Sequence, residues 1–366
     1  MIRNACMCAA FGLAAIVGFV DAKPACNVSN PSADPQLAHW PPSAAGALDA
    51  MIARNAHKGR YAVFDMDNTS YRGDLEESLL AFLEAKGVLS REALDPSLRI
   101  IPFNDTASHN ESLYSYYQRL CAIDDTVCYA FAAQVFSDVP LRQLKVYVDE
   151  LMALDNAIDV QYYEHGVLTN STVSPPTVFC GQVELYQKLM HNGIDVYVVS
   201  AASEELVRMV ASDPKYGYNV KPQNVIGVTL LMKDPKSGSV TSARKQIKEG
   251  HYNERDNMDL VMTPFLWAPA TWKEGKWAAI LAYIDPWKRP ILVGGDTPDS
   301  DGPMLFQGVD VGRGGIHLWV NRKDEYMEQL NDMRTRFAAD QKREGLPVWA
   351  QENWVIVKPD DLMCRA

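Results

Sequence analysis

The sequence contains no Cys-x-x-Cys pair, so a structural zinc site built on cysteine pairs is not expected. It also lacks an excess of basic residues: 35 Lys and Arg stand against 46 Asp and Glu, giving a formal net charge of −11. This balance argues against a nucleic-acid partner and favours a cationic or metal-bound ligand. There is no internal repeat or low-complexity segment, and after residue 22 no apolar run is long enough to span a bilayer. We therefore expect neither a nucleic-acid partner nor stable membrane insertion of the chain that follows residue 22.

The first 22 residues have the pattern of a secretory signal peptide. Arg3 supplies the positive charge, residues 5–20 are apolar, and Val20-Asp21-Ala22 offers small residues ahead of cleavage before Lys23. An uncleaved anchor is the alternative, because the apolar run is somewhat long for a signal. The predicted location is secreted or periplasmic.

Removal of that segment leaves five cysteines, and an exported chain permits disulfide bonds. Cys121 and Cys128 are close enough in sequence to join a local loop. The odd number leaves at least one thiol over, and the pairing of Cys26, Cys180 and Cys364 stays open.

Strand-like and helix-like segments alternate on both sides of a long central segment. Expected strands are 61–64, 194–199, 225–232, 290–293 and 316–320. Expected helices are 43–57, 182–191, 204–210, 276–283 and 324–342. Such alternation predicts an α/β fold with a doubly wound, mostly parallel, Rossmann-like sheet.

The central segment has apolar residues at helical spacing and no convincing strand run. It is expected to be a helical cap inserted into the core. The predicted organisation is a signal peptide at 1–22, a discontinuous Rossmann-like catalytic core at 23–74 and 170–366, and a helical cap at 75–169.

Two carboxylates follow the first expected strand. Asp65 and Asp67 come directly after residues 61–64, and alternation in an extended segment points both to the same side. Carboxylates held this close repel, so the pair favours a cation, and Mg²⁺ prefers oxygen ligands. Taken alone, the same residues also fit a solvated turn after a strand.

Three further features follow later strands or open a helix. Ser200 comes after residues 194–199, Lys276 lies at the start of an expected helix, and Gly295-Asp296 begins a stretch with three acidic residues. Parallel strands carry their ligands at their carboxyl ends, where these residues fall. Individually, Ser200 also fits a helix N-cap, Lys276 a solvated side chain, and the acidic stretch a surface turn.

Taken together, these motifs resemble the four-motif signature of the haloacid dehalogenase superfamily. The match runs in order through Asp65-x-Asp67-x-Thr69, Ser200, Lys276 and Gly295-Asp296, across roughly residues 60–320. Within that superfamily, the stretches Asp-Met-Asp-Asn-Thr, Ser-Ala-Ala-Ser, Gly-Lys-Trp and Gly-Gly-Asp-Thr-Pro-Asp-Ser-Asp are most similar to those of exported phosphorylcholine phosphatases.

The resemblance implies Mg²⁺-dependent hydrolysis of a small phosphate monoester through an aspartyl-phosphate. Asp65 would be the nucleophile, and Asp67 would protonate the leaving group and then activate water. Thr69 and Ser200, with the backbone N–H groups that follow Ser200 from Ala201 on, would hold phosphoryl oxygens.

The remaining members of the signature would complete the charge balance. Lys276 would neutralise the charge on the phosphoryl oxygens, and Mg²⁺ would lie between Asp65, the backbone carbonyl of Asp67 and Asp296. Asp299 or Asp301 would orient metal-bound water or Lys276. In the common superfamily pattern a second acid lies four residues after the first, where Ser300 stands here, so the choice between Asp299 and Asp301 is open.

A choline group would need aromatic faces and a carboxylate, since a quaternary ammonium donates no hydrogen bond. Glu77 and Tyr71 are the first candidates because they are nearest in sequence to Asp65. Further candidates, each also compatible with core or surface positions, are Glu76, Tyr114, Tyr116, Tyr117, Trp267 and Trp272. The run Tyr116-Tyr117-Gln118 lacks an acidic residue beside its aromatic rings.

The predicted reaction is hydrolysis of phosphorylcholine to choline and phosphate. Alternatives are a phosphatase for phosphoserine or a sugar phosphate, a phosphoryl-transferring mutase, and a non-catalytic ligand-binding protein. A binding protein would not need Asp67, and an exported location favours a hydrolase over a mutase.

Overall fold

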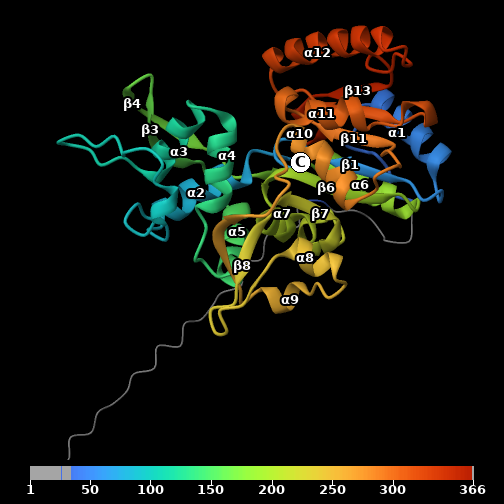
Figure 1. Ribbon diagram of the computed structural model, residues 1–366. Coiled ribbons are helices and arrows are strands. Elements are labelled where there is room, and N and C mark those ends of the chain that lie inside the picture. Colours follow the sequence, from blue (N-terminus) through green and yellow to red (C-terminus); the bar gives the residue numbers. More distant parts are fainter. Residues whose placement is uncertain (1–25, 27–33, 365–366) are drawn as a thin grey trace, which may run out of the picture.

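The core of the protein is a six-stranded sheet in which all strand pairs are parallel (Figure 1). The computed structural model describes Cys26 and residues 34–364, so the predicted signal peptide lies outside the described residues. The strand order is β13-β12-β11-β1-β6-β7. The strands are β1 (Tyr61–Phe64), β6 (Asp195–Ser203), β7 (Val225–Val228), β11 (Leu292–Gly295), β12 (Ile316–Val320) and β13 (Trp354–Val357).

The central strand β1 is buried on both faces. Ala62 and Phe64 join the apolar cluster that includes α1 (Pro42–Asn55) and α6 (Cys180–His191). Tyr61 and Val63 join a second cluster with α10 (Glu274–Tyr283), α11 (Pro298–Gly308) and α12 (Asp324–Arg343). Because alternate residues of one strand meet helices on opposite faces, the predicted doubly wound parallel sheet is confirmed.

Several predicted boundaries were wrong. The single strand expected at 225–232 is two strands, β7 and β8 (Leu230–Lys233), separated by Thr229 and lying in different sheets. Strand β6 continues to Ser203, beyond the predicted end at residue 199, and α7 (Glu204–Ala211) begins directly after it. The edge strand β13 was not among the predicted strands.

The segment from α2 (Leu75–Ala85) to β4 (Val167–Val173) forms a lobe beside the sheet, on the left of Figure 1, and the predicted cap boundary at residue 169 falls inside β4. Its helices are α2, α3 (Leu113–Cys121), α4 (Asp125–Gln134) and α5 (Leu141–Met152). The expectation that no strand lies in this segment was wrong: β3 (Ile158–Glu164) and β4 form an antiparallel hairpin. Both strands are mostly exposed and therefore lack a continuous apolar run. A residue pair ending in glycine, His165-Gly166, forms the two-residue turn of this hairpin with both φ angles positive, and such a pair in the sequence can indicate a hairpin.

A second, three-stranded sheet packs against the lobe. Its strand order is β10-β8-β9, with β9 at Val240–Thr241 and β10 at Val261–Leu266. Along the chain, α8 (Ala243–Lys248) and α9 (Glu254–Asn257) connect β9 to β10. The Leu141 N–H donates to the Leu260 carbonyl, and the Gln134 side chain donates to the Pro264 carbonyl. Two short strands, β2 (Tyr71–Arg72) and β5 (Thr177–Val178), pair where the chain enters and leaves the lobe. Hydrogen bonds from the end of α4 and the start of α5 therefore hold the lobe against the second sheet, and the β2–β5 pair joins the two chain segments that connect the lobe to the core.

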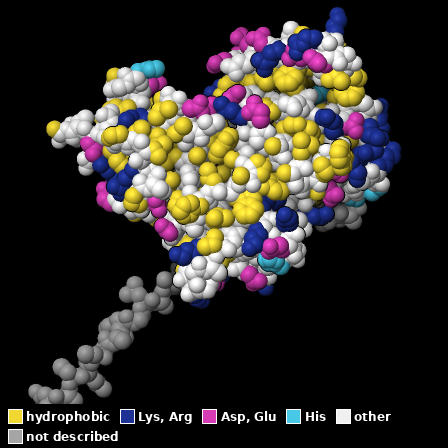
Figure 2. Space-filling model, viewed as in Figure 1, with side chains coloured by type: hydrophobic (Ala, Val, Ile, Leu, Met, Phe, Trp, Pro, Cys, Tyr) yellow, Lys and Arg dark blue, Asp and Glu magenta, His cyan; other side chains and the backbone are white. Residues whose placement is uncertain are grey.

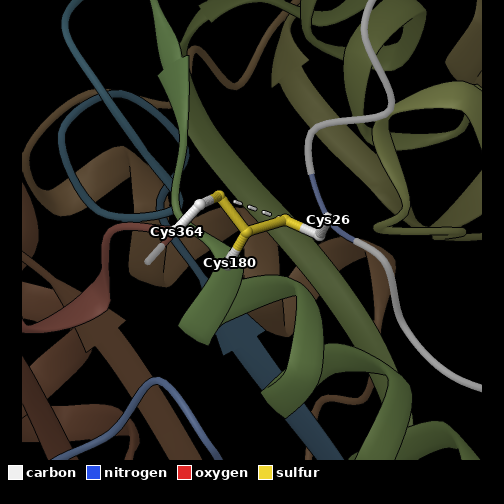
Figure 3. A group of neighbouring side chains, drawn as sticks. All are labelled: Cys26, Cys180 and Cys364. Carbon is white, nitrogen blue, oxygen red and sulfur yellow. Dashed lines mark hydrogen bonds between the residues drawn. A yellow bond between two sulfur atoms is a disulfide. The ribbon is translucent and has the colours of Figure 1, made fainter. Parts of the chain in front are cut away.

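The five cysteines of the described chain form two groups. Cys121 and Cys128 form a disulfide between the end of α3 and α4. Cys26, Cys180 and Cys364 lie together at the start of α6, with the Cys180 sulfur within bonding distance of each of the other two (Figure 3). A sulfur atom forms one disulfide bond at a time. Either pairing ties a segment near one chain end to α6.

No helix among the described residues is sufficiently long and apolar to cross a membrane. On the face shown in Figure 2, acidic and basic side chains are intermixed along α12 at the top, and hydrophobic side chains are spread over the region between the sheet and the lobe.

Candidate active site

The candidate site lies where β1 and β11 end side by side. Asp65 follows β1, and its N–H donates to the carbonyl of Gly294 on β11 at 3.0 Å. Asp296 follows β11. The chain turns away after Asp65 at Asn68, which has a positive φ of 56°, and the Asn68 side chain accepts the N–H of Gly73 at 3.1 Å. Two neighbouring parallel strands thus bring two acidic residues to the same edge of the sheet.

Lys276 joins two of the acidic residues. Its Nζ, near the start of α10, lies 2.6 Å from Asp65 Oδ1 and 2.6 Å from Asp301 Oδ1. All three side chains are buried. Asp301 Oδ2 accepts the N–H groups of Asp296 at 2.9 Å and Thr297 at 3.0 Å. Every buried charge in this group therefore has an opposite charge or a hydrogen-bond donor against it.

Gly295 permits this close packing. A Cβ at this position would lie 2.6 Å from Asp301 Cβ and 2.7 Å from its Oδ2. Any side chain would displace Asp301 from the N–H groups it accepts, so the Gly-Asp sequence has a direct steric reason.

Burial sets the protonation of the carboxyl groups. It raises the pKa of Asp65 to about 8, with Lys276 acting in the opposite direction and Asp301 and Asp296 adding to the rise. The pKa of Asp67 is raised well above its usual range by burial and by the charges of Asp74 and Asp65. Burial alone would lower the pKa of Lys276, but Asp301 and Asp65 raise it. Lys276 is therefore a permanent cation in this cluster.

Asp67 is held through one oxygen. Its Oδ1 accepts the Tyr71 hydroxyl at 2.6 Å and the Leu75 N–H at 2.8 Å. Tyr71 is fully buried and does not line the cavity, so its contact here is with Asp67. With Oδ1 accepting two bonds, Oδ2 is the oxygen available for a proton.

Three of the acidic residues suit a divalent cation. One carboxylate oxygen each of Asp65, Asp296 and Asp301 lies within 4.8 Å of the others. Asp67 and Asp299 contribute no side chain to this group among the described residues. Asp299 is exposed and pairs with Lys273 at 2.7 Å. Buried carboxylate oxygens are the donors that Mg²⁺ prefers, so the residues present fit this ion.

The predicted phosphate-holding residues lie around the same cluster. Thr69 Oγ1 donates to Asp296 Oδ1 at 3.0 Å and makes a longer contact of 3.4 Å with Asp65 Oδ2. Ser200 was expected after a strand, but it lies inside β6, and its hydroxyl accepts the Ala202 N–H at 3.1 Å. Ala201 and Ala202 line the cavity, whereas Ser200 does not.

A cavity of about 120 Å³ opens over these residues and has two unlike sides. On the lobe side it is lined by Asp74, Glu76, Tyr117 and Tyr129. Burial raises the pKa of Asp74 to about 6 and that of Glu76 well above its usual range. The Glu76 carboxylate accepts the Ser203 N–H at 2.7 Å. A cation bound beside Asp74 and Glu76 would stabilise their charged carboxylate forms and offset the effect of burial on their pKa values.

On the α12 side the cavity is lined by Arg322 and Tyr326. The Arg322 guanidinium donates to Asp296 Oδ2 and, at 3.0 Å, to Thr297 Oγ1, and it lies 4.8 Å from the centre of the Tyr326 ring. One side of the cavity is therefore acidic and the other basic.

Several predicted substrate contacts lie elsewhere in the structure. The Glu77 carboxylate accepts the Tyr114 hydroxyl at 2.6 Å and the Gln118 amide at 3.0 Å, and it does not line the cavity. Tyr116 is in the core of the lobe. Trp267 and Trp272 also do not line the cavity.

Four charged or aromatic residues of the cavity were not predicted from the sequence: Asp74, Tyr129, Arg322 and Tyr326. Arg322 follows β12 by two residues, so the rule that ligands lie at strand ends could have identified it. Asp74 is the N-cap of α2 and accepts the Glu77 N–H, which is a recognisable capping signal but not a functional one. Tyr129 and Tyr326 are brought to the cavity by helix packing, and no local signal marks them.

Comparison with known proteins gives one close relative. The chain is 61% identical over 354 residues to the phosphorylcholine phosphatase of Pseudomonas aeruginosa, covering 97% of each chain. No family model matches. Among solved structures, a conserved protein of unknown function from Anaerococcus prevotii DSM 20548 has a TM-score of 0.57 at 19% identity, covering 89% of this chain and 97% of that one. That likeness concerns the fold alone.

Proposed function

The chain belongs to the phosphorylcholine phosphatase family of the haloacid dehalogenase superfamily, and from this premise we propose that it hydrolyses phosphorylcholine to choline and phosphate. The observation that carries the proposal is the buried Asp65 with Lys276 at 2.6 Å and with Asp296 and Asp301 beside it. This arrangement provides a nucleophile and a fixed cation at the carboxyl edge of a parallel sheet.

Asp65 is the proposed nucleophile. One of its carboxylate oxygens attacks phosphorus, the bond from phosphorus to the choline oxygen breaks, and an aspartyl-phosphate forms on Asp65. Lys276, together with Ala201 at the cavity wall, is suited to the charge on the non-bridging oxygens. Thr69 does not line the cavity, and its proposed role is to hold Asp296 and Asp65 in position through its hydroxyl.

Asp67 is the proposed acid and base. Burial raises its pKa, which favours the protonated form, and that proton passes to the departing choline oxygen. The ionised Asp67 then takes a proton from the water that attacks the aspartyl-phosphate, which releases phosphate and restores Asp65. Tyr71 holds Asp67 in position through Oδ1 and leaves Oδ2 for these transfers.

Asp65, Asp296 and the backbone carbonyl of Asp67 are the proposed ligands for Mg²⁺. The ion would supply positive charge for the phosphoryl oxygens and would favour the ionised form of Asp65 among its acidic neighbours. We assign Asp301, rather than Asp299, to Lys276. The reason is that Asp301 is buried against Lys276, whereas Asp299 is exposed and pairs with Lys273.

The lobe side of the cavity is the proposed choline site. A quaternary ammonium is bound by negative charge and by aromatic faces, and Asp74, Glu76, Tyr117 and Tyr129 provide both. The earlier assignment of Glu77 and Tyr71 to substrate is thereby replaced by roles in supporting the cavity, Glu77 through Tyr114 and Tyr71 through Asp67. Residues 75–169 are the proposed cap over the core formed by 23–74 and 170–366.

Export to the periplasm or medium is also proposed. It is supported by the sequence pattern of residues 1–22 and by the disulfide between Cys121 and Cys128, which an oxidising compartment permits.

The test compares phosphorylcholine, phosphoethanolamine, phosphoserine and p-nitrophenyl phosphate by kcat/KM in the wild type and in Asp65→Asn. We expect phosphorylcholine to be the best substrate and Asp65→Asn to abolish turnover while the protein stays folded. Equal kcat/KM for all four compounds would refute the choline site but not the phosphatase. Normal turnover by Asp65→Asn would refute the proposed mechanism.

A further inference from the structure

A second hollow of about 400 Å³ lies beside the catalytic cavity. It is formed where strands of the same sheet end: Asn321, Arg322 and Lys323 follow β12, and Lys358 follows β13. Arg72 on β2 completes its basic lining. We call the hollow lined by Arg72, Arg322, Lys323 and Lys358 the basic vestibule.

The basic vestibule borders the catalytic cavity, because Asn68 and Arg322 line both. The guanidinium of Arg322 has five N–H groups, and its contacts with Asp296 and Thr297 use two of them. Arg322 can therefore keep its bond to Asp296 and still donate to an anion in the basic vestibule.

The charges of the basic vestibule favour an anion in a chain with a net charge of −11. Its four basic side chains face two acidic ones, Asp324 and Asp360. The ion pair between Arg72 and Asp360 is a surface pair, since the Asp360 side chain is 85% exposed. Such pairs are weak, so a dianion can compete for Arg72.

A helix end adds to this preference. α12 is 20 residues long, and it begins beside the hollow with Lys323 as its N-cap and no side chain capping its first N–H groups. Uncapped N–H groups at the start of a long helix, with the partial positive charge of the helix dipole, bind oxyanions.

We propose that the basic vestibule binds inorganic phosphate as it leaves the catalytic cavity. The inference rests on the proposed function, in which hydrolysis yields one cation and one dianion. The acidic lobe side of the cavity favours the choline cation, and the Arg322 side adjoins the basic vestibule. The two products thus leave the catalytic cavity by different sides.

Binding of inorganic phosphate to the metal-free protein tests this directly by titration calorimetry. Arg72 and Lys358 line the basic vestibule but not the catalytic cavity, so variants at these two positions report on phosphate bound in the vestibule. We expect Arg72→Gln and Lys358→Gln each to weaken phosphate binding by about 3- to 10-fold, and the double variant by about 10-fold or more. Both residues are exposed, so the variants should fold normally.

Arg343→Gln is the matched control. Arg343 is also exposed and paired with acidic residues, but it lies at the other end of α12, about 30 Å away along the helix. It should leave phosphate binding unchanged. Equal binding by the wild type and the double variant, or equal weakening by Arg343→Gln, would overturn the proposal.

Steady-state inhibition separates product phosphate from the phosphate group of incoming substrate. If the basic vestibule serves product exit, the double variant should lose more affinity for inhibitory phosphate than it loses in kcat/KM for phosphorylcholine. A fall in kcat/KM by the same factor, disappearing at high salt, would instead show a docking site for substrate and would overturn the exit role. The binding measurement needs no turnover, so it stands or falls separately from the proposed reaction.

Discussion

Asp301→Asn should destabilise the protein strongly, although the side chain keeps its size. Asp301 is fully buried, binds Lys276 through Oδ1 and accepts two backbone N–H groups through Oδ2. An asparagine must turn its NH₂ either toward the Lys276 ammonium or toward the N–H groups of Asp296 and Thr297. Both orientations set donor against donor, and neither restores the lost charge.

The expected cost is about 3 kcal/mol in the free energy of unfolding. Removing one partner of a buried ion pair costs roughly 3–5 kcal/mol. The lower end applies here because Lys276 keeps Asp65 as a partner, and because Asp301 no longer repels Asp65 and Asp296. Denaturant unfolding at neutral pH measures the difference, and kcat should fall as well, since Lys276 loses the group that positions it.

Asp299→Asn is the matched control, two residues away on the same helix. Asp299 is 67% exposed and pairs with Lys273 at the surface, so its removal should cost less than about 0.5 kcal/mol. If the two variants had equal stability and equal kcat, the assignment of Asp301 to Lys276 would be refuted.

Three further predictions concern metal, substrate and pH. Excess chelator should stop turnover, and full activity under those conditions would contradict the metal role assigned to Asp65 and Asp296. Glu76→Gln should raise the KM for phosphorylcholine by about 10-fold and leave the KM for p-nitrophenyl phosphate nearly unchanged. Glu77→Gln should change the two KM values by the same factor. If instead Glu77→Gln raised only the KM for phosphorylcholine, the choline site would be assigned to Glu77. His317 is buried against Trp354, and burial lowers its pKa from 6.5 to about 4. His317 takes up its proton near pH 6.5 in the unfolded chain but only near pH 4 in the folded chain. The contribution of neutral His317 to the free energy of unfolding is therefore complete above pH 6.5, and about 3 kcal/mol of it is lost as the pH falls from 6.5 to 4. Unfolding curves of the wild type and His317→Gln across this range test this, and parallel curves would refute it.

The parts of the site that follow strands could be predicted, because parallel strands end at one edge of the sheet. Asp65, Asp296 and Lys276 meet as the sequence order suggested. Asp299 and Asp301 could not be separated in this way, since both lie in the first turn of α11 and only tertiary packing decides which one is buried. Ser200 was placed after a strand because the apolar run ends at Val199, but pairing with β7 extends β6 to Ser203.

The lobe was harder to predict, yet one residue in it carried a usable signal. In α2 the buried apolar residues Leu79, Leu80 and Leu83 lie three, four and seven positions after Glu76, so Glu76 is on the buried stripe of that helix. Glu77 is one position away and lies off the stripe. Distance in sequence from Asp65 favoured Glu77, whereas helical periodicity selects Glu76. A carboxylate on an apolar stripe is costly unless something compensates it, and here the compensation is the Ser203 N–H together with an open cavity. A buried acidic residue that interrupts a helical apolar pattern is therefore a better guide to the lining of this cavity than closeness in sequence to Asp65.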